Sequence, residues 1–138
     1  MTKRSTRLLI AVAGCGLVLS GCQTMKAGKS LLPGQTASSA SVLAALDGGL
    51  VAHAGVELSK NDKQRALEAE YRALEAGDVG QSVPWKGDDA SGSVIAAAPY
   101  QVGSQNCRQY THKITADGKD TEAKGVACRN QDGTWSPI

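Results

Sequence analysis

Residues 105–129 read QNCRQYTHKITADGKDTEAKGVACR, and this stretch decides the fold. Asp117-Gly118 at its centre is a strong signal for a two-residue β-hairpin turn, because a type I′ turn requires positive φ at both central residues. The flanking segments, 105–116 and 119–129, are rich in Thr, Tyr, Val and Ile spaced among polar residues. We therefore predict that they pair as two long antiparallel strands.

The register of this hairpin places its two cysteines opposite each other. A two-residue turn at Asp117-Gly118 pairs Cys107 with Cys128, and the alternation of pairs along the ladder makes theirs a non-hydrogen-bonded pair. Cα atoms at such a position lie about 4.5 Å apart, within the range that a disulfide spans. The same register sets Lys113 against Glu122 as a favourable charge pair. We predict a Cys107–Cys128 disulfide, as is typical of exported proteins.

A three-residue turn is the alternative. It would shift the register by one, set Cys107 opposite Ala127 and turn the two thiols to opposite faces, unless a bulge at Gly125 compensated. We prefer the simpler register. In it, one face of the hairpin sets larger side chains against small ones, and we predict that a helix or another strand covers this face. That face consists of Arg108, Tyr110, His112 and Ile114 opposite Thr121, Ala123, Gly125 and Ala127.

A helix is predicted over residues 60–76, where nearly every residue is a strong helix former. Ser59 is a suitable N-cap and Gly77 a suitable stop. The helix carries a narrow apolar stripe that is predicted to pack on the sheet. The stripe consists of Ala66, Leu67, Tyr71, Ala73 and Leu74.

Shorter strands are predicted before and after the hairpin. Residues 81–86 and 93–97 flank a loop of composition Gly-Asp-Asp-Ala-Ser-Gly at 87–92, and a short closing strand covers 134–136. Pro84 places the first of these strands at a sheet edge, because proline cannot donate to a central ladder.

These elements predict an α+β fold for residues 41–138: a small antiparallel sheet of four to five strands within 81–136, arranged as a meander of hairpins, with the amphipathic helix packed on one face. A further short helix is predicted over 42–54, weakened by about 1 kcal/mol each at Gly48 and Gly49. The absence of Phe indicates a modest core, so Trp85, Tyr100, Tyr110 and Trp135 are interpreted as core residues and not as a recognition surface.

The chain begins with the features of an export signal. Lys3, Arg4 and Arg7 precede an apolar run over 8–19, which is too short to be a spanning helix of about 20 residues. We predict that residues 1–21 form a signal peptide. Without those three cations, the formal net charge of +2 becomes nearly neutral, so the composition excludes the basic footprint of a nucleic-acid-binding protein.

The end of that signal looks like a bacterial lipobox, Leu19-Ser20-Gly21-Cys22. Proteins with this motif are cleaved before the cysteine, here between Gly21 and Cys22, after the Cys22 thiol has received a diacylglyceryl group. Residues 22–40 are then the lipidated amino terminus and a flexible tether rich in Ser, Gly and Thr. The alternative is a plain signal peptide with a cysteine nearby by chance.

The sequence gives no reason to expect catalysis, a metal site or a cofactor. No Cys or His pair has metal-ligand spacing, and no nucleophile stands in a recognisable context. His53 and His112 are interpreted as structural or exposed, and Asp88-Asp89 as a solvated turn. We therefore expect no catalytic residue, no metal ligand and no enzyme.

The stretches ALEAEYRAL (66–74), CRQYTHKI (107–114) and GVACRNQDGTW (125–135) resemble the rickettsial seventeen-kilodalton common surface antigen family. The resemblance covers residues 42–138, and its members are proteobacterial outer-membrane lipoproteins without assigned biochemistry. It implies a lipid-anchored, non-enzymatic envelope component that meets the membrane through its N-terminal lipid. Gln23 after the acylated cysteine implies the outer membrane, on a face that is not specified. The alternative function is a protein-binding module, such as a hydrolase inhibitor or an accessory of envelope assembly, with an envelope or host partner that remains unknown.

Overall fold

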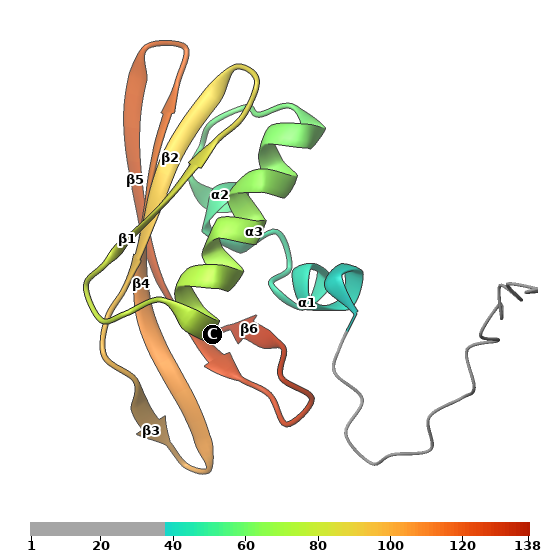
Figure 1. Ribbon diagram of the computed structural model, residues 1–138, viewed down its shortest axis with the longest axis vertical. Helices are drawn as coiled ribbons and strands as arrows, with labels where there is room; N and C mark the ends of the chain where they lie inside the picture. Colours follow the sequence, from blue (N-terminus) through green and yellow to red (C-terminus); the bar gives the residue numbers. More distant parts are fainter. Residues whose placement is uncertain (1–37) are drawn as a thin grey trace, which may run out of the picture. The chain divides into compact units, whose positions relative to one another are not determined.

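The computed structural model describes residues 38–138, and the predicted signal peptide with Gly21 and Cys22 lies outside these described residues. The described part contains three helices and six strands (Figure 1). In chain order they are α1 (Ser39–Ala45), α2 (Gly49–His53), α3 (Lys60–Ala76), β1 (Ser82–Lys86), β2 (Ala90–Ala96), β3 (Tyr100–Val102), β4 (Gln105–Ala116), β5 (Lys119–Arg129) and β6 (Trp135–Pro137).

The strands form one antiparallel sheet in the order β1-β2-β4-β5-β6, with β3 paired to β4 beyond the end of β2. This meander, with helices α2 and α3 on one of its faces, is the α+β fold that the sequence predicted (Figure 1). The strand count exceeds the four to five expected because of β3. That strand has only three residues and follows Pro99, so it has no strand pattern of its own.

The β4–β5 hairpin has the predicted register. Asp117 and Gly118 both have positive φ, at 51° and 69°, as a two-residue type I′ turn requires. Cys107 faces Cys128 and the two are joined by a disulfide, with their Cα atoms 4.0 Å apart. Lys113 faces Glu122, at 3.8 Å between Nζ and Oε2. Side chains alternate between a buried face, which includes Tyr110 and His112, and an outer face.

The first two strands differ from the prediction at one point. β2 begins at Ala90 and not at residue 93, because its whole length pairs with β4, as far as Ala116. Trp85 lies opposite Gly92, where a side chain would meet the indole ring, so the glycine makes room for it. Pro84 lies in β1, which forms one edge of the sheet, as expected.

Helix α3 occupies residues 60–76, and the Ser59 hydroxyl accepts a hydrogen bond from the Asp62 amide at 3.1 Å. Its buried stripe is rotated from the predicted one, because Leu67 and Tyr71 are only half-buried. The fully buried side chains include two carboxylates that the apolar pattern did not reveal. They are Asp62, Ala66, Ala69, Glu70, Ala73 and Leu74.

The single helix expected over 42–54 is two helices, α1 and α2. Asp47, Gly48 and Gly49 all have positive φ, at 46°, 81° and 59°, and a right-handed helix cannot continue through three such residues. The glycines therefore redirect the chain where we expected them only to weaken a helix.

Residues from both layers fill the core between the helices and the inner face of the sheet. Its fully buried members include Leu46, Leu74, Val94 and Ile114. Trp85, Tyr110 and Trp135 are buried as expected, whereas the side chain of Tyr100 is 40% exposed. Within residues 38–138, no helix has both the length and the apolar character needed to cross a bilayer.

Candidate functional site

His112, at the middle of β4, is the centre of a buried polar cluster. Its Nδ1 lies 2.7 Å from Oε1 of Glu70 on α3, and its Nε2 lies 2.8 Å from the indole Nε1 of Trp85 on β1. The side chains of His112 and Glu70 are both completely shielded from solvent. The cluster therefore joins the helix layer to two strands of the sheet.

The contacts of His112 determine which of its nitrogens carries the proton. An indole N–H can only donate, so Nε2 of His112 accepts from Trp85. The proton of the neutral imidazole is therefore on Nδ1, where it is donated to the Glu70 carboxylate. A doubly protonated ring would direct a second N–H at the indole N–H, which would cost the hydrogen bond to Trp85.

Glu70 has a second role at the start of α2. Its two carboxylate oxygens accept hydrogen bonds from the backbone amides of Leu50 and Val51, each at 3.0 Å. Amides in the first helical turn have no partner within their own helix, and a carboxylate there also suits the helix dipole. Gly49 permits this contact, because a Cβ at that position would collide with Oε2 of Glu70.

Tyr110 lies beside this cluster on the same face of β4. Its hydroxyl is the one buried side-chain polar atom without a hydrogen-bond partner in the described part of the chain. Burial, followed by the negative charge of Glu70, raises the pKa of the Tyr110 hydroxyl well above its usual range. The phenol therefore stays neutral at any physiological pH.

The cluster holds structural elements together, and its groups are not placed to act as a general base. A general base must reach a substrate proton, yet Nδ1, Nε2 and both Glu70 oxygens are already engaged and shielded from solvent. His53, the other histidine, is exposed at the end of α2. Among residues 38–138, no group of three or more His, Cys, Asp or Glu side chains could hold a metal ion.

The missed role of Glu70 had one signal in the sequence. Residues 66, 70 and 73 fall on the same face of a helix, so a carboxylate stands inside the stripe of small residues that faces the sheet. A charge at such a position requires a buried partner. Nothing local identified that partner as His112, which is 42 residues away.

The loop at Asp88-Asp89 is attached to the start of α3. The backbone amides of Asp88 and Asp89 donate to the carboxylate of Asp62, at 2.7 and 3.4 Å, while their own side chains are exposed. The hydrogen bond from the Asp88 amide is the main reason why the pKa of Asp62 lies below its ordinary value, against the opposing effect of burial. The loop is thus a solvated turn whose backbone is held by the buried carboxylate of Asp62.

Arg108 closes the other end of α3. Its guanidinium donates to the backbone carbonyls of Ala73, Leu74 and Gly77 at 2.9–3.1 Å, and to that of Ala97 at 2.8 Å. These include the last carbonyls of the helix, which otherwise lack donors. Burial lowers the pKa of Arg108 from its ordinary value, although a guanidinium stays charged at physiological pH.

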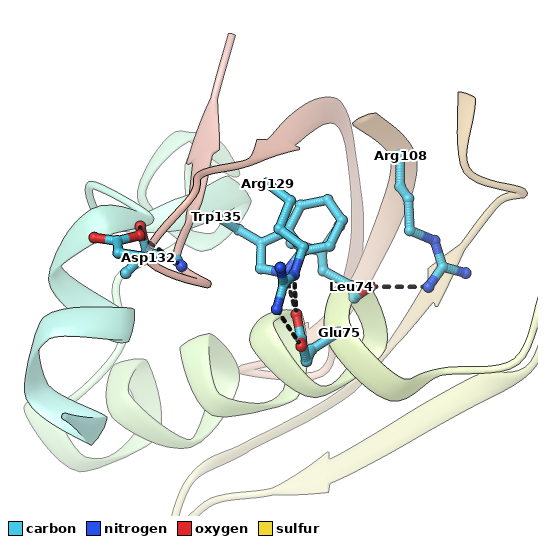
Figure 2. A network of polar contacts seen from close by, with 7 residues as sticks. Leu74, Glu75, Arg108, Arg129, Asp132 and Trp135 are labelled. Carbon is cyan, nitrogen blue, oxygen red and sulfur yellow. Dashed lines mark hydrogen bonds and ion pairs between the residues drawn. The ribbon is translucent and has the colours of Figure 1, made fainter. Parts of the chain in front are cut away.

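A second polar network lies where β5 and β6 meet the last turn of α3 (Figure 2). Arg129 makes two hydrogen bonds of 2.9 Å to the carboxylate of Glu75, which also accepts from the indole of Trp135 at 2.8 Å. The bonds from Arg129 are the largest cause of the lowered pKa of Glu75, and the same contact raises the pKa of Arg129. Asp132 holds the turn before β6 by accepting from the Thr134 amide and hydroxyl.

A polar concavity lies next to this network. It has a volume of about 610 Å³ and is lined by residues 102–106 and 129–131. Carboxamides dominate its lining, from Gln105, Asn106, Asn130 and Gln131. The predicted disulfide partners, Cys107 and Cys128, immediately adjoin both walls of this pocket and are buried.

Comparison with known proteins shows that part of the chain is similar to proteins described as surface antigens. Residues 72–136 match the model of a family described as 17 kDa outer membrane surface antigen. A 17 kDa surface antigen of Rickettsia bellii (strain RML369-C) is 36% identical over 87 residues, which cover 61% of this chain and 55% of that protein. Those of Rickettsia felis and Rickettsia conorii are 36% and 33% identical over 84 residues, covering 59% of this chain and 53% of theirs. The chain thus spans about half the length of these curated relatives. No solved structure matches it.

Proposed function

Because the chain belongs, through its residues 72–136, to the 17 kDa outer membrane surface antigen family, we propose that it is a lipid-anchored and non-enzymatic component of the outer membrane. The family match carries this proposal, since it covers part of α3 and nearly the whole sheet. The relatives are named as surface antigens, and that name describes an exposed envelope protein without assigning it a reaction.

The anchor in this proposal is Cys22. The preceding residues have the charge and apolar pattern of an export signal, and Leu19-Ser20-Gly21 supplies the small residues before the cut. One acyl chain gives only marginal membrane binding, whereas a diacylglyceryl group with an acylated amine holds a protein stably. In this proposal, residues 23–37 lie between the lipidated cysteine and the N-cap of α1, which begins at Ser39.

The chemistry of the folded part supports a non-enzymatic role. The one histidine that has a carboxylate partner, His112, is shielded from solvent and already makes a hydrogen bond at each nitrogen. The pocket near the disulfide offers carboxamides and a paired guanidinium, which bind ligands and do not transfer protons readily near neutral pH.

Metabolic labelling tests the anchor. In cells that express the full chain and are fed a clickable fatty acid, Cys22→Ala is expected to abolish labelling of the protein. Cys15→Ala is the matched control, because Cys15 lies inside the apolar run and is expected to leave with the signal. Labelling that persists in Cys22→Ala, or that is lost equally in Cys15→Ala, would contradict lipidation at Cys22.

Membrane separation tests the location. On a density gradient, the labelled protein is expected to sediment with outer-membrane markers, and protease treatment of intact cells then reports which face carries the domain. Gln23→Asp is expected to shift the protein toward the inner-membrane fraction, because aspartate after the acylated cysteine favours retention there. Recovery of the unchanged protein in the inner-membrane fraction would refute the proposed location.

A further inference from the structure

We infer that the pocket lined by residues 102–106 and 129–131 is a binding site for a neutral saccharide. Its volume of about 610 Å³ lies within the range of small-ligand sites. Each carboxamide presents one acceptor oxygen and two N–H donors. Sugar hydroxyls both donate and accept, so neighbouring hydroxyls match such groups. The pocket contains four carboxamides: Gln105, Asn106, Asn130 and Gln131.

The pocket has no unbalanced charge. Arg129 is the one charged residue of its lining, and its Nε and Nη2 donate to the Glu75 carboxylate, which balances its charge. A phosphate or sulfate ligand would meet a guanidinium whose charge is already balanced by that carboxylate. The electrostatics therefore favour an uncharged ligand over an anionic one.

Some of the carboxamides orient the site, and others are available to a ligand. Asn130 donates to the hydroxyls of Thr134 and Ser136, both at 2.8 Å, and accepts weakly from Gln105. Among residues 38–138, the NH₂ group of Asn106 and the carboxamide of Gln131 make no hydrogen bond, and both side chains are exposed. Asn106 and Gln131 are thus the groups that a hydroxyl-rich ligand would meet first.

The walls of the pocket are held in place before any ligand arrives. The disulfide joins the two strands at the positions next to Asn106 and Arg129, and the Glu75–Arg129–Trp135 network fixes the second wall against α3 (Figure 2). A rigid site loses less conformational entropy on binding, which matters most for weak ligands such as sugars. The crosslink therefore lies where it benefits recognition as well as stability.

An exposed aromatic ring lies near the rim. Tyr100 precedes Val102 by two positions on β3, so both side chains are on the same face of the strand and about 7 Å apart. Its ring is 40% exposed, although a chain without Phe has few aromatic residues to fill its core. Sugar rings have an apolar C–H face that packs on aromatic rings, which complements the carboxamides at their hydroxyl edges.

A peptide is the competing ligand, because β3 also presents a short strand edge. Recognition of an extended peptide requires pockets for alternate side chains in addition to main-chain bonds. Val102 is the one apolar side chain of the lining, so this concavity offers no such pockets. We therefore favour the saccharide and treat peptide binding as an outcome of the test.

NMR of the ¹⁵N-labelled full chain, in a detergent without a sugar headgroup, reads the site directly. The probes are tri-N-acetylchitotriose, cellotriose and maltotriose, with inorganic sulfate and a neutral Gly-Ser hexapeptide as competitors. At least one trisaccharide is expected to cause saturable shifts of the side-chain NH₂ signals of Asn106 and Gln131. The signals of Gln109, which is exposed on the outer face of β4, are expected to stay unchanged.

Variants separate binding from folding. The double variant Asn106→Ala/Gln131→Ala is expected to weaken binding at least about tenfold, since each lost hydrogen bond contributes on the order of that factor. Gln109→Ala, on the same strand as Asn106, is the matched control and should bind normally. Tyr100→Ala is expected to weaken binding while Tyr100→Phe preserves it, because the ring face is what makes the contact.

The inference is overturned by any of three results. The first is the absence of saturable shifts with all three trisaccharides. The second is binding of sulfate or of the hexapeptide at the same NH₂ signals in place of the sugars. The third is equal weakening by Gln109→Ala and by the double variant.

Discussion

The residue with the most consequential surroundings is His112. Its two hydrogen bonds have opposite directions, because it donates to Glu70 and accepts from Trp85. Removing it would leave a buried carboxylate short of one donor and a buried indole N–H without an acceptor. Unpaired buried polar groups are among the few single-residue causes of large destabilisation.

We therefore predict that His112→Phe lowers the free energy of unfolding by about 3 kcal/mol, since it breaks two buried hydrogen bonds, one of them to a charged group. Urea denaturation of the full chain, followed by Trp fluorescence, measures this change. His53→Phe is the control, because His53 is exposed and its replacement should change stability by less than about 0.5 kcal/mol. Equal effects of the two variants would show that the buried cluster contributes little.

A comparison of two glycines tests the contact between Glu70 and α2. Gly49 and Gly55 both have positive φ, but only at Gly49 would a Cβ collide with Glu70. Gly55→Ala is expected to lower the free energy of unfolding by about 1 kcal/mol, from backbone strain alone. Gly49→Ala is expected to lower the free energy of unfolding by about 2 kcal/mol more, because the Glu70 carboxylate must move away from the Leu50 and Val51 amides.

Thermal unfolding of the two glycine variants measures this difference. Similar midpoints for Gly49→Ala and Gly55→Ala would show that Glu70 moves aside at little cost. The comparison isolates packing from backbone conformation, because both substitutions carry the same type of strain.

Among the elements, α3 is fixed at both of its ends by buried charges. Asp62 at its start receives the amides of the β1–β2 loop, and Arg108 from β4 donates to the carbonyls at its end. Both charges agree with the helix dipole, because Asp62 is negative at the start of the helix and Arg108 is positive at its end. These contacts fix the position of the helix along its axis, in addition to its packing on the sheet.

The lowered pKa of Asp62 predicts a dependence of stability on acid pH. A carboxylate whose folded pKa lies below its unfolded value stabilises the protein above about pH 4, and this contribution is lost as the pH falls through the folded pKa. Asp62→Asn should therefore be less stable than the wild type at pH 7 and lose less stability on acidification. Urea unfolding at several pH values between 3 and 7 measures the two slopes.

Asp88→Asn is the control for this experiment. It changes an exposed carboxylate of the same loop and keeps the amide that donates to Asp62. Its acid profile should follow that of the wild type. Parallel profiles for wild type and Asp62→Asn would contradict the role assigned to Asp62.

Elements with local signals were predictable from the sequence, and elements set by distant contacts were not. Asp117-Gly118 determined the hairpin and its register, and Ser59 marked the start of α3. Asp47, Gly48 and Gly49 divide residues 42–54 into two helices, but the placement of α2 depends on Glu70 accepting from its first amides, and that contact spans 19 to 20 residues. Likewise, the pocket depends on β3, whose three residues have no pattern of their own.

For the whole molecule, the buried cluster joins α2, α3 and two strands of the sheet through hydrogen bonds, in addition to apolar packing. Opening α2 would leave the Glu70 carboxylate without two of its donors while it remains buried against His112. A helix of five residues is not stable by itself, so its persistence depends on this contact. We expect α2 to open only when the sheet and α3 also separate.

Hydrogen exchange tests that expectation. The amides of Leu50 and Val51 should exchange about as slowly as those of the β4–β5 hairpin, because both require global opening. The amide of Val42 in α1, which bonds to the backbone carbonyl of Ser38 at the exposed start of the helix, should exchange faster. Exchange of Leu50 and Val51 at the rate of Val42 would show that α2 opens independently.

The alternation of side chains along the hairpin has a consequence for immune recognition. Gln109 and Lys113 from β4 and Glu122 and Lys124 from β5 share the outer face, while the residues between them along the chain point inward. A serum raised against the native protein would thus recognise mosaics assembled from several strands. Synthetic linear peptides cannot reproduce such epitopes, so blots of the boiled and reduced chain would understate the response of an animal immunised with the native protein.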